Sequence, residues 1–176
     1  YNISNLEAYP AVLQNRLHEK GYEHITVINR GVSGDTTSGG LSRLIWTLNR
    51  DKPDLFILEL GANDMLRATP PALTKNNLDE ILRVVVTEYK IPTMLLGMYA
   101  DPVLGNEFIS AYDFMYRDLA AKYDVIVYPF FLEGVVGNKD LLLPDNLHPN
   151  IKGIRLMVEN TLPYVMRFID KASQQQ

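Results

Sequence analysis

Four short, almost continuously apolar runs, separated by longer segments with helical spacing, constrain the fold of this chain more than any other feature. A strand that is covered by helices on both faces has continuous rather than alternating hydrophobicity, and this pattern is typical of parallel sheets. We therefore predict four parallel strands, at residues 24–29, 55–60, 93–98 and 125–129.

Helices are predicted before, between and after these runs, because apolar residues recur there every three or four positions. The segments are marked by Tyr9 to Leu17, Leu41 to Leu48, Leu78 to Tyr89, Phe108 to Leu119 and Ile154 to Ile169. Gly21 follows the first segment at the position of a helix-ending glycine. The alternation of helices and strands predicts an α/β fold, with helices on both faces of a parallel sheet.

The order of the strands leads to a further expectation. In a flavodoxin-like three-layer α/β/α fold, the strand order is 2-1-3-4-5, so the first strand lies between the second and the third. Because the chain opens on a helix, we expect that first strand to lie upstream of Tyr1 and to be absent from this chain. No repeat or low-complexity linker divides residues 1–176, so a single domain is predicted.

Composition excludes several classes of function. The formal net charge is −4, and no run of Lys or Arg forms the basic stripe that binding to nucleic acid requires. No apolar stretch approaches the ~20 residues of a membrane span, so stable membrane insertion is not expected. The chain has no cysteine, which excludes disulfides, thiolate catalysis and Cys-ligated metals.

The sharpest candidate site is the pair Asp145 and His148. Ligands bind at the carboxyl ends of the strands in open α/β sheets, and the loop with this pair follows the last predicted strand. A carboxylate three residues before a histidine can accept a hydrogen bond from Nδ1, so that Nε2 can act as a general base near neutral pH. The structural alternative is that Asp145 caps the last helix and His148 is an ordinary loop residue.

Two more candidates follow earlier strands. Asn63 comes after a buried strand and a glycine, where its amide could donate to an oxyanion, although turns often contain Asn for structural reasons. Gly34 could bring a backbone N–H close to a ligand, or it could be an ordinary glycine of a left-handed turn. It is the joint arrangement of these residues that favours the functional interpretation.

Four motifs, GVSGDTTSGG, LELGANDMLR, PFFLEGV and DNLHPN, resemble in order and spacing those of the SGNH (GDSL-type) hydrolases. Within them, the chain is similar to the bacterial thioesterase I, lysophospholipase and arylesterase branch, from Tyr1 to about Pro163. The resemblance implies a serine hydrolase without a cofactor that acts on small acyl or aryl esters, thioesters or lysophospholipids. It also favours a periplasmic or secreted location over the cytoplasm.

The resemblance further implies a role for each matching residue. Gly34 and Asn63 become the oxyanion donors, His148 the general base and Asp145 its orienting partner. Residues 98–108 resemble the mobile substrate loop of the family. The candidate substrate-binding residues are Leu66, Arg67, Met98, Tyr99 and Pro102.

The chain departs from the family in one respect, since it contains no Gly-Asp-Ser-Leu block with the nucleophilic serine. Tyr1 resembles the tyrosine that follows this block, so we expect the nucleophile upstream of Tyr1. Ser33 is an alternative, because Gly31-Val32-Ser33-Gly34 is similar to a nucleophile elbow, but Asp35 stands where that motif has its last glycine.

Two other functions compete with ester hydrolysis. A metal-dependent phosphoesterase could draw on Asp35, Asp64, Asp145 and His148, but such sites usually use several histidines and only His148 is well placed, so no metal is predicted. A non-catalytic binding module is the second alternative. The sequence does not indicate an oligomeric state.

Overall fold

The computed structural model describes residues 3–174, so Tyr1 lies outside the described residues. It forms two compact units. The first consists of Tyr1–Gly31 and Phe131–Asp170, and the second of Val32–Phe130 and Lys171–Gln176. The single domain over residues 1–176 stays a prediction. None of the helices within residues 3–174 is long and apolar enough to cross a membrane.

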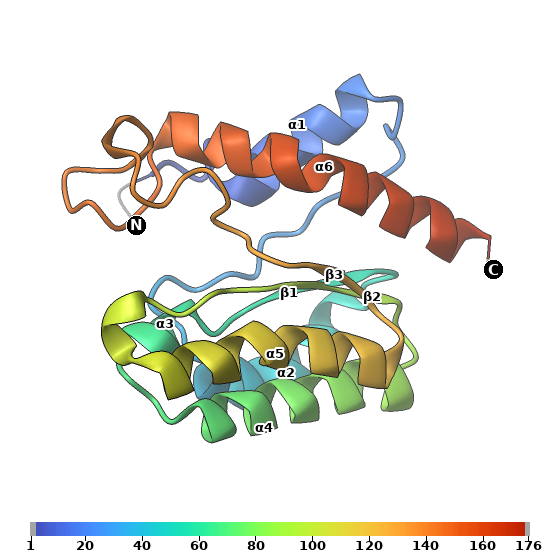
Figure 1. Ribbon diagram of the computed structural model, residues 1–176. Coiled ribbons are helices and arrows are strands. Elements are labelled where there is room, and N and C mark those ends of the chain that lie inside the picture. The colour runs from blue at the N-terminus through green and yellow to red at the C-terminus, as the bar shows by residue number, and fades with distance from the viewer. Residues whose placement is uncertain (1–2, 175–176) are drawn as a thin grey trace. The chain divides into compact units, whose positions relative to one another are not determined.

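The second unit is built on a parallel sheet (Figure 1). Its strands are β1 (Phe56–Glu59), β2 (Thr93–Leu96) and β3 (Ile126–Tyr128), in the order β1-β2-β3. Both pairs are parallel, with Phe56 opposite Thr93 and Leu96 opposite Tyr128. The α/β class and three of the four predicted strands are therefore confirmed.

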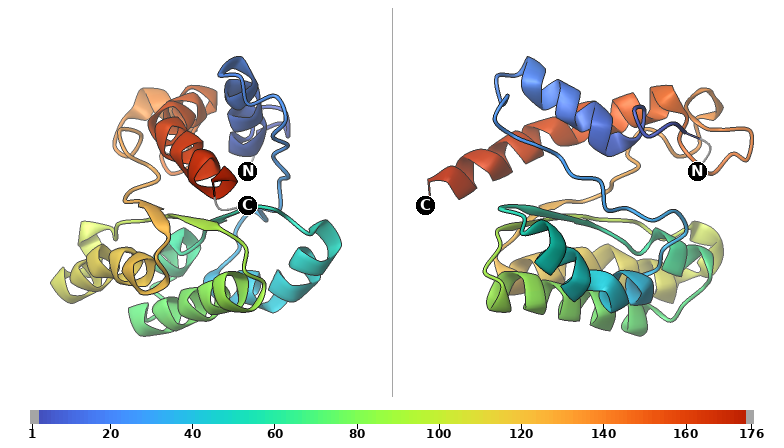
Figure 2. Two further views of the ribbon diagram at one scale, coloured as in Figure 1. Left: turned by 90° about the vertical axis from the view of Figure 1, so that its right-hand side faces the viewer. Right: turned by 180° about the vertical axis from the view of Figure 1, so that it is seen from behind.

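Three helices cover one face of this sheet, as Figures 1 and 2 show from different sides. They are α2 (Thr37–Asp51), α4 (Pro71–Leu82) and α5 (Asn106–Tyr123). The unit also contains the short helix α3 (Ala62–Leu66), the π-helical turn η1 (Arg83–Glu88) that continues α4, and the 3-10 turn η2 (Pro102–Leu104).

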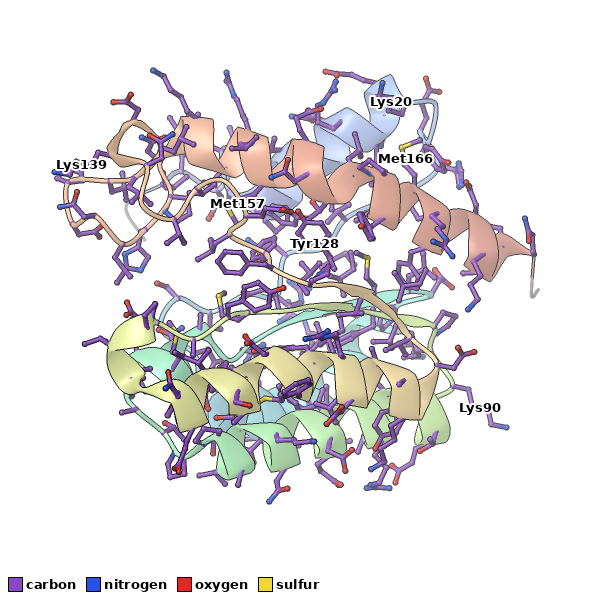
Figure 3. The ribbon with its side chains drawn as sticks, viewed as in Figure 1. Lys20, Lys90, Tyr128, Lys139, Met157 and Met166 are labelled. Carbon is purple, nitrogen blue, oxygen red and sulfur yellow. The ribbon has the colours of Figure 1, made fainter. Side chains whose placement is uncertain are left out.

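Large side chains fill the layer between this sheet and its helices (Figure 3). Leu78 on α4, Leu95 on β2 and Tyr112 on α5 have no exposed surface. The apolar spacing predicted from the sequence therefore corresponds to the buried faces of these elements. Lys90, in the turn before β2, has a left-handed φ of +56°, and its side chain points away from the sheet (Figure 3).

The first unit contains α1 (Tyr9–Glu19), the 3-10 turn η3 (Lys139–Leu141) and α6 (Ile151–Ser173) as far as Asp170. A hydrogen bond and an ion pair join α1 to α6. Tyr9 Oη lies 2.7 Å from Thr161 Oγ1, and Arg16 Nε donates to the carboxylate of Glu159 at 2.6 Å.

Gly21 ends α1 as predicted. It has a φ of +88°, and its N–H donates to the carbonyl of His18 at 2.9 Å. The N–H of Tyr22 donates to the carbonyl of Leu17 at 3.0 Å, which completes a Schellman motif.

The predicted strand at residues 24–29 is wrong, because this segment forms no ladder with any described strand. The side chain of Gln14 on α1 bonds to its backbone instead. Gln14 Nε2 donates to the carbonyl of Ile25 at 2.7 Å, and Gln14 Oε1 accepts from the N–H of Val27. One amide side chain thus bonds to alternate residues, as the backbone of a neighbouring strand would.

Candidate active site

Asp145 and His148 form a bonded pair in the loop between η3 and α6. His148 Nδ1 lies 2.8 Å from Asp145 Oδ2. Asp145 Oδ1 accepts the backbone N–H groups of Leu147 and His148, each at 3.0 Å. With Oδ2 accepting from the ring, Nδ1 carries the proton of a neutral imidazole, so a second proton can only be accepted at Nε2.

The loop around the pair is held by its own backbone. The N–H of Leu143 donates to the carbonyl of His148 at 2.8 Å, and that of Asn146 donates to the carbonyl of Leu143 at 2.9 Å. Asn146 has a left-handed φ of +56°, a conformation that Asn adopts more readily than most residues. The chain therefore reverses tightly between the carboxylate and the imidazole.

Hydrogen bonds to the carboxylate lower the pKa of Asp145 to about 2. The backbone N–H of His148 makes the largest contribution, followed by the backbone N–H of Leu147 and the side chain of His148. All three bonds favour the charged form. Asp145 is therefore ionised at every pH at which a histidine can act as a base.

Asp145 does not cap the last helix. Asn150 does so, because its Oδ1 accepts from the N–H groups of Lys152 at 2.9 Å and Gly153 at 3.1 Å. Its Nδ2 donates to the carbonyls of Asp140 and Leu142, which ties the helix start to the loop. The structural alternative for Asp145 is wrong, and its carboxylate serves His148 and the loop.

Gly34 lies in a tight turn of the second unit, before α2. The N–H of Asp35 donates to the carbonyl of Val32 at 3.1 Å, and Gly34 has a φ of +79°, as the third residue of a type II turn requires. A Cβ on Gly34 would lie 4.0 Å from Arg67 Nη2, which is an ordinary contact. The backbone conformation, rather than a lack of space, is therefore what favours glycine.

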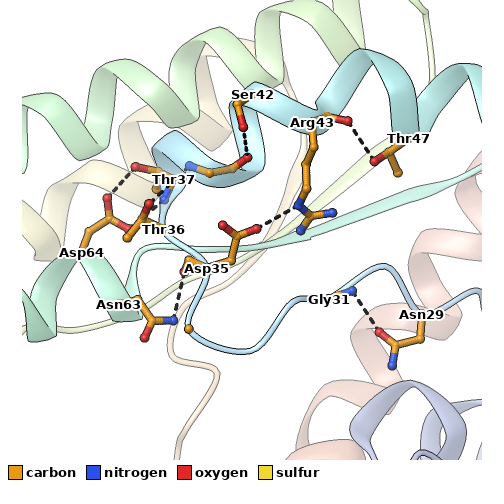
Figure 4. A network of polar contacts seen from close by, with 12 residues as sticks. Asn29, Gly31, Asp35, Thr36, Thr37, Ser42, Arg43, Thr47, Asn63 and Asp64 are labelled. Carbon is orange, nitrogen blue, oxygen red and sulfur yellow. Dashed lines mark hydrogen bonds and ion pairs between the residues drawn. The ribbon is translucent and has the colours of Figure 1, made fainter.

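Asn63 lies in the first turn of α3, directly after β1. Its Nδ2 donates to the carbonyl of Asp35 at 2.9 Å, so it reaches the residue next to Gly34 (Figure 4). Gly61, at the start of α3, has a φ of +116°, and a Cβ there would collide with Tyr116 Oη. The glycine after the strand thus allows the sharp turn that brings Asn63 to this position.

Two further contacts hold this part of the chain, and the sequence interpretation missed both. Asp64, which is 1% exposed, accepts from the N–H and the hydroxyl of Thr37 at 2.8 and 2.6 Å (Figure 4). Arg43 Nε donates to the carboxylate of Asp35 at 2.9 Å. The sequence carries a signal only for Thr36, whose side chain caps α2 by accepting from the N–H of Gly39, and no pattern marks Asp64 as the partner of Thr37.

The predicted substrate-binding residues differ in their surroundings. Arg67, the C-cap residue of α3, donates through Nη2 to the carbonyl of Gly34 at 2.9 Å. Tyr99 is 43% exposed and stacks on Phe130, with ring centroids 4.8 Å apart. Met98 is buried, whereas Leu66 is exposed, and Pro102 begins η2.

The loop after β2 is tied to α3 by a contact that no sequence motif indicated. The N–H of Asp101 donates to Met65 Sδ at 3.2 Å. Met65 lies in α3, so this bond holds the start of the candidate substrate loop, residues 98–108, beside the helix that carries Asn63. Thioether sulfur is a weak acceptor, and a helical Met gives no distinctive pattern in a sequence.

The structure thus assembles two groups. Asp145 and His148 belong to the first unit, and Gly34, Asn63 and Arg67 belong to the second. Among residues 3–174, no three or more His, Asp and Glu side chains are grouped so that they could hold a metal ion. Asp35 and Asp64, which the metal-dependent alternative would use, already accept bonds from Arg43 and Thr37.

Comparison with known proteins gives matches over most of the chain. Residues 1–156 match a family described as the GDSL-like Lipase/Acylhydrolase family. Esterase TesA of Pseudomonas aeruginosa is 37% identical over 161 residues, which cover 92% of this chain and 79% of that protein. Thioesterase 1/protease 1/lysophospholipase L1 of Escherichia coli strain K12 is 33% identical over 150 residues, which cover 85% of this chain and 70% of that protein.

The fold also matches a solved structure. That of AlinE4, an SGNH-hydrolase family esterase, aligns with a TM-score of 0.78 at 42% sequence identity. The alignment covers 95% of this chain and 88% of AlinE4.

Proposed function

We propose that this chain, which belongs to the GDSL-like lipase/acylhydrolase family, hydrolyses carboxylic esters or thioesters through an acyl-enzyme intermediate. The observation that carries the proposal is the 2.8 Å bond between His148 Nδ1 and Asp145 Oδ2, because it orients an imidazole for proton transfer. Relatives named as esterase, arylesterase and thioesterase support the same class of reaction.

In the proposed mechanism, His148 is the general base and then the general acid. Its Nε2 takes the proton of the attacking hydroxyl and later gives it to the leaving group, while Asp145 stabilises the imidazolium. The backbone N–H of Gly34 and the amide of Asn63 donate to the oxyanion of the tetrahedral intermediate. Asn63 Nδ2 has two N–H groups, and the bond to Asp35 uses one of them.

The proposed nucleophile is a serine in a segment that precedes Tyr1. Its support is the resemblance of four motifs to those of the SGNH hydrolases. We also propose a single domain and the strand order 2-1-3-4-5, in which the strand that ends at this serine lies beside β1 and gives residues 24–29 the partner that no described strand provides. Within the described residues, β1 has a strand partner on one side only, and a parallel sheet with an open apolar edge is unfavourable.

The proposed substrates are small acyl or aryl esters and thioesters with an apolar portion. Exposed apolar side chains around the loop after β2 support this, since Leu66 is 51% and Val103 is 85% exposed. Tyr99 and Pro102 lie in the same loop, and Met98 lies at its start. A periplasmic or secreted location is proposed on the family resemblance, and fractionation of the native cells tests it.

Labelling of the full encoded protein with a fluorophosphonate tests the function and the nucleophile together. We expect hydrolysis of a p-nitrophenyl ester, complete inhibition by the reagent, and one modified serine upstream of Tyr1 in the peptide map. Modification of Ser33 would refute the proposed nucleophile. Hydrolysis that resists the reagent but is abolished by chelation would favour the metal-dependent alternative. A protein that neither hydrolyses esters nor reacts would be a non-catalytic binding module.

A further inference from the structure

The turn with Gly34 is bonded to α3 at consecutive positions. Arg67 Nη2 donates to the carbonyl of Gly34, and Asn63 Nδ2 donates to the carbonyl of Asp35, both at 2.9 Å. Asn63 and Arg67 are four residues apart, so they lie on the same face of this short helix. Side chains from one helical face therefore bond to the carbonyls of Gly34 and Asp35, the first two carbonyls after the N–H of Gly34 along the chain.

Arg67 itself has a well-defined backbone position. Its N–H donates to the carbonyl of Asn63 at 3.1 Å, and the next residue, Ala68, donates to the carbonyl of Met65 at 2.9 Å. Ala68 has a left-handed φ of +49°, and the N–H of Thr69 donates to the carbonyl of Asp64 at 2.9 Å, so α3 ends in a Schellman motif. The guanidinium therefore extends from a fixed point toward the turn.

Gly34 needs such support from outside the turn. It lies on an exposed surface, and glycine has access to more backbone conformations than any other residue. The bond from Asp35 to Val32 closes the turn but leaves its orientation to other contacts. An oxyanion donor must point at one position in space, because transition-state stabilisation depends on donors that are already aligned.

We propose that Arg67 is a positioning residue that holds the Gly34 turn, so that the N–H of Gly34 and the amide of Asn63 serve the same oxyanion. This inference rests on the proposed function and replaces the expected role of Arg67 as a substrate contact. Arg67 touches the carbonyl of Gly34 and does not touch the reacting atoms in this role. Its loss therefore lowers kcat and leaves KM unchanged.

The test uses the full encoded protein with Arg67→Met, Arg67→Lys and, as a matched control, Arg83→Met. Arg83 is also exposed and pairs with Glu80 and Glu88, away from the turn. With a p-nitrophenyl ester, we expect kcat of Arg67→Met to fall about tenfold, less than the ~10²-fold that a misplacement of 1 Å can cause. Arg67→Lys keeps one donor and should recover at least a third of the wild-type kcat, and Arg83→Met should match the wild type.

A second readout is the ¹⁵N order parameter of the Gly34 amide, which does not depend on catalysis. We expect it to fall in Arg67→Met from about 0.85, typical of rigid backbone, to below about 0.6. A raised KM with unchanged kcat would show a substrate contact and overturn the proposal. So would an unchanged order parameter, or a Lys variant as slow as the Met variant. If the wild type hydrolyses no ester, the proposed function fails, and the order parameter still decides whether Arg67 holds the turn.

Discussion

Asp145 and His148, three residues apart in one loop, are joined by a hydrogen bond. Asn63 and Arg67 instead donate to carbonyls that lie 28 and 33 residues away in the sequence. In the first group Asp145 is exposed and His148 is half-buried, and the loop is held by its own backbone. The second depends on the packing of α2 and α3, with the buried Asp64 between them. The proposed proton transfer thus belongs to a local structure, and the proposed oxyanion stabilisation belongs to one held by tertiary contacts, so the two should respond differently to substitution.

The largest expected effect is that of His148→Ala, which should lower kcat about 10⁴-fold, because the proposed general base is lost while the proposed oxyanion donors remain. The midpoint of urea unfolding should stay close to that of the wild type, since the group is local and neither side chain is buried. Steady-state kinetics and a urea titration measure both. His24→Ala is the matched control and should retain full activity. A large loss of stability in His148→Ala would contradict the local character of this group.

Asn63→Ala should lower kcat ~10²–10³-fold, the usual effect of removing one oxyanion donor. It also removes a bond to the carbonyl of Asp35, so unlike His148→Ala it should reduce the free energy of unfolding by about 1 kcal/mol. Kinetics and urea unfolding of the same preparation give both values. Asn160→Ala, which removes a bond to the carbonyl of Glu133, is the control. Near-wild-type turnover would exclude Asn63 from the mechanism.

Asp64→Ala tests, through stability alone, the group of Gly34, Asn63 and Arg67, which tertiary contacts hold together. It leaves the buried N–H and hydroxyl of Thr37 without their acceptor, which should reduce the free energy of unfolding by about 1–3 kcal/mol. Asp118→Ala removes an exposed ion pair with Lys75 and should cost under about 1 kcal/mol. If both substitutions lowered the free energy of unfolding equally, the contact of Asp64 with Thr37 would not support the group of Gly34, Asn63 and Arg67.

The smallest expected effect is the dependence of stability on the charge of Asp145. Its pKa is lowered in the folded state to about 2, so the stability it contributes is fully present above about pH 4, the pKa range of an unfolded Asp. This contribution is lost as the pH falls toward 2. Urea unfolding of wild type and Asp145→Asn at pH 5 and pH 2 should show a difference that shrinks at the lower pH. A constant difference would mean that the bonds to the carboxylate do not favour its charge.

The sequence predicted the local structures well, because their causes lie close together in the chain. The Asp145–His148 spacing, the helix end at Gly21 and the three strands of the sheet each follow from a few neighbouring residues. The family resemblance added the oxyanion roles of Gly34 and Asn63, which spacing alone could not give and which stay predictions.

What the sequence could not predict depends on contacts between distant segments. The pairing of Asp64 with Thr37 and of Arg67 with Gly34 needs the geometry of two helices, and neither residue pair is marked by a pattern. Residues 24–29 have the composition of a strand, but a strand requires a partner, and the amide of Gln14 takes up its backbone groups instead. Composition predicts the preference of a segment and not its partner.

The exposure of the loop that holds Asp145 and His148 affects how the protein responds to heat. Its base is an antiparallel bridge between Leu142 and Pro149, and it carries mostly exposed residues. Segments with few buried apolar contacts open and close on their own, at a lower free energy than the sheet and its helices. Heating should therefore inactivate the protein reversibly before its circular dichroism changes, so that the upper temperature of activity is a property of one surface loop.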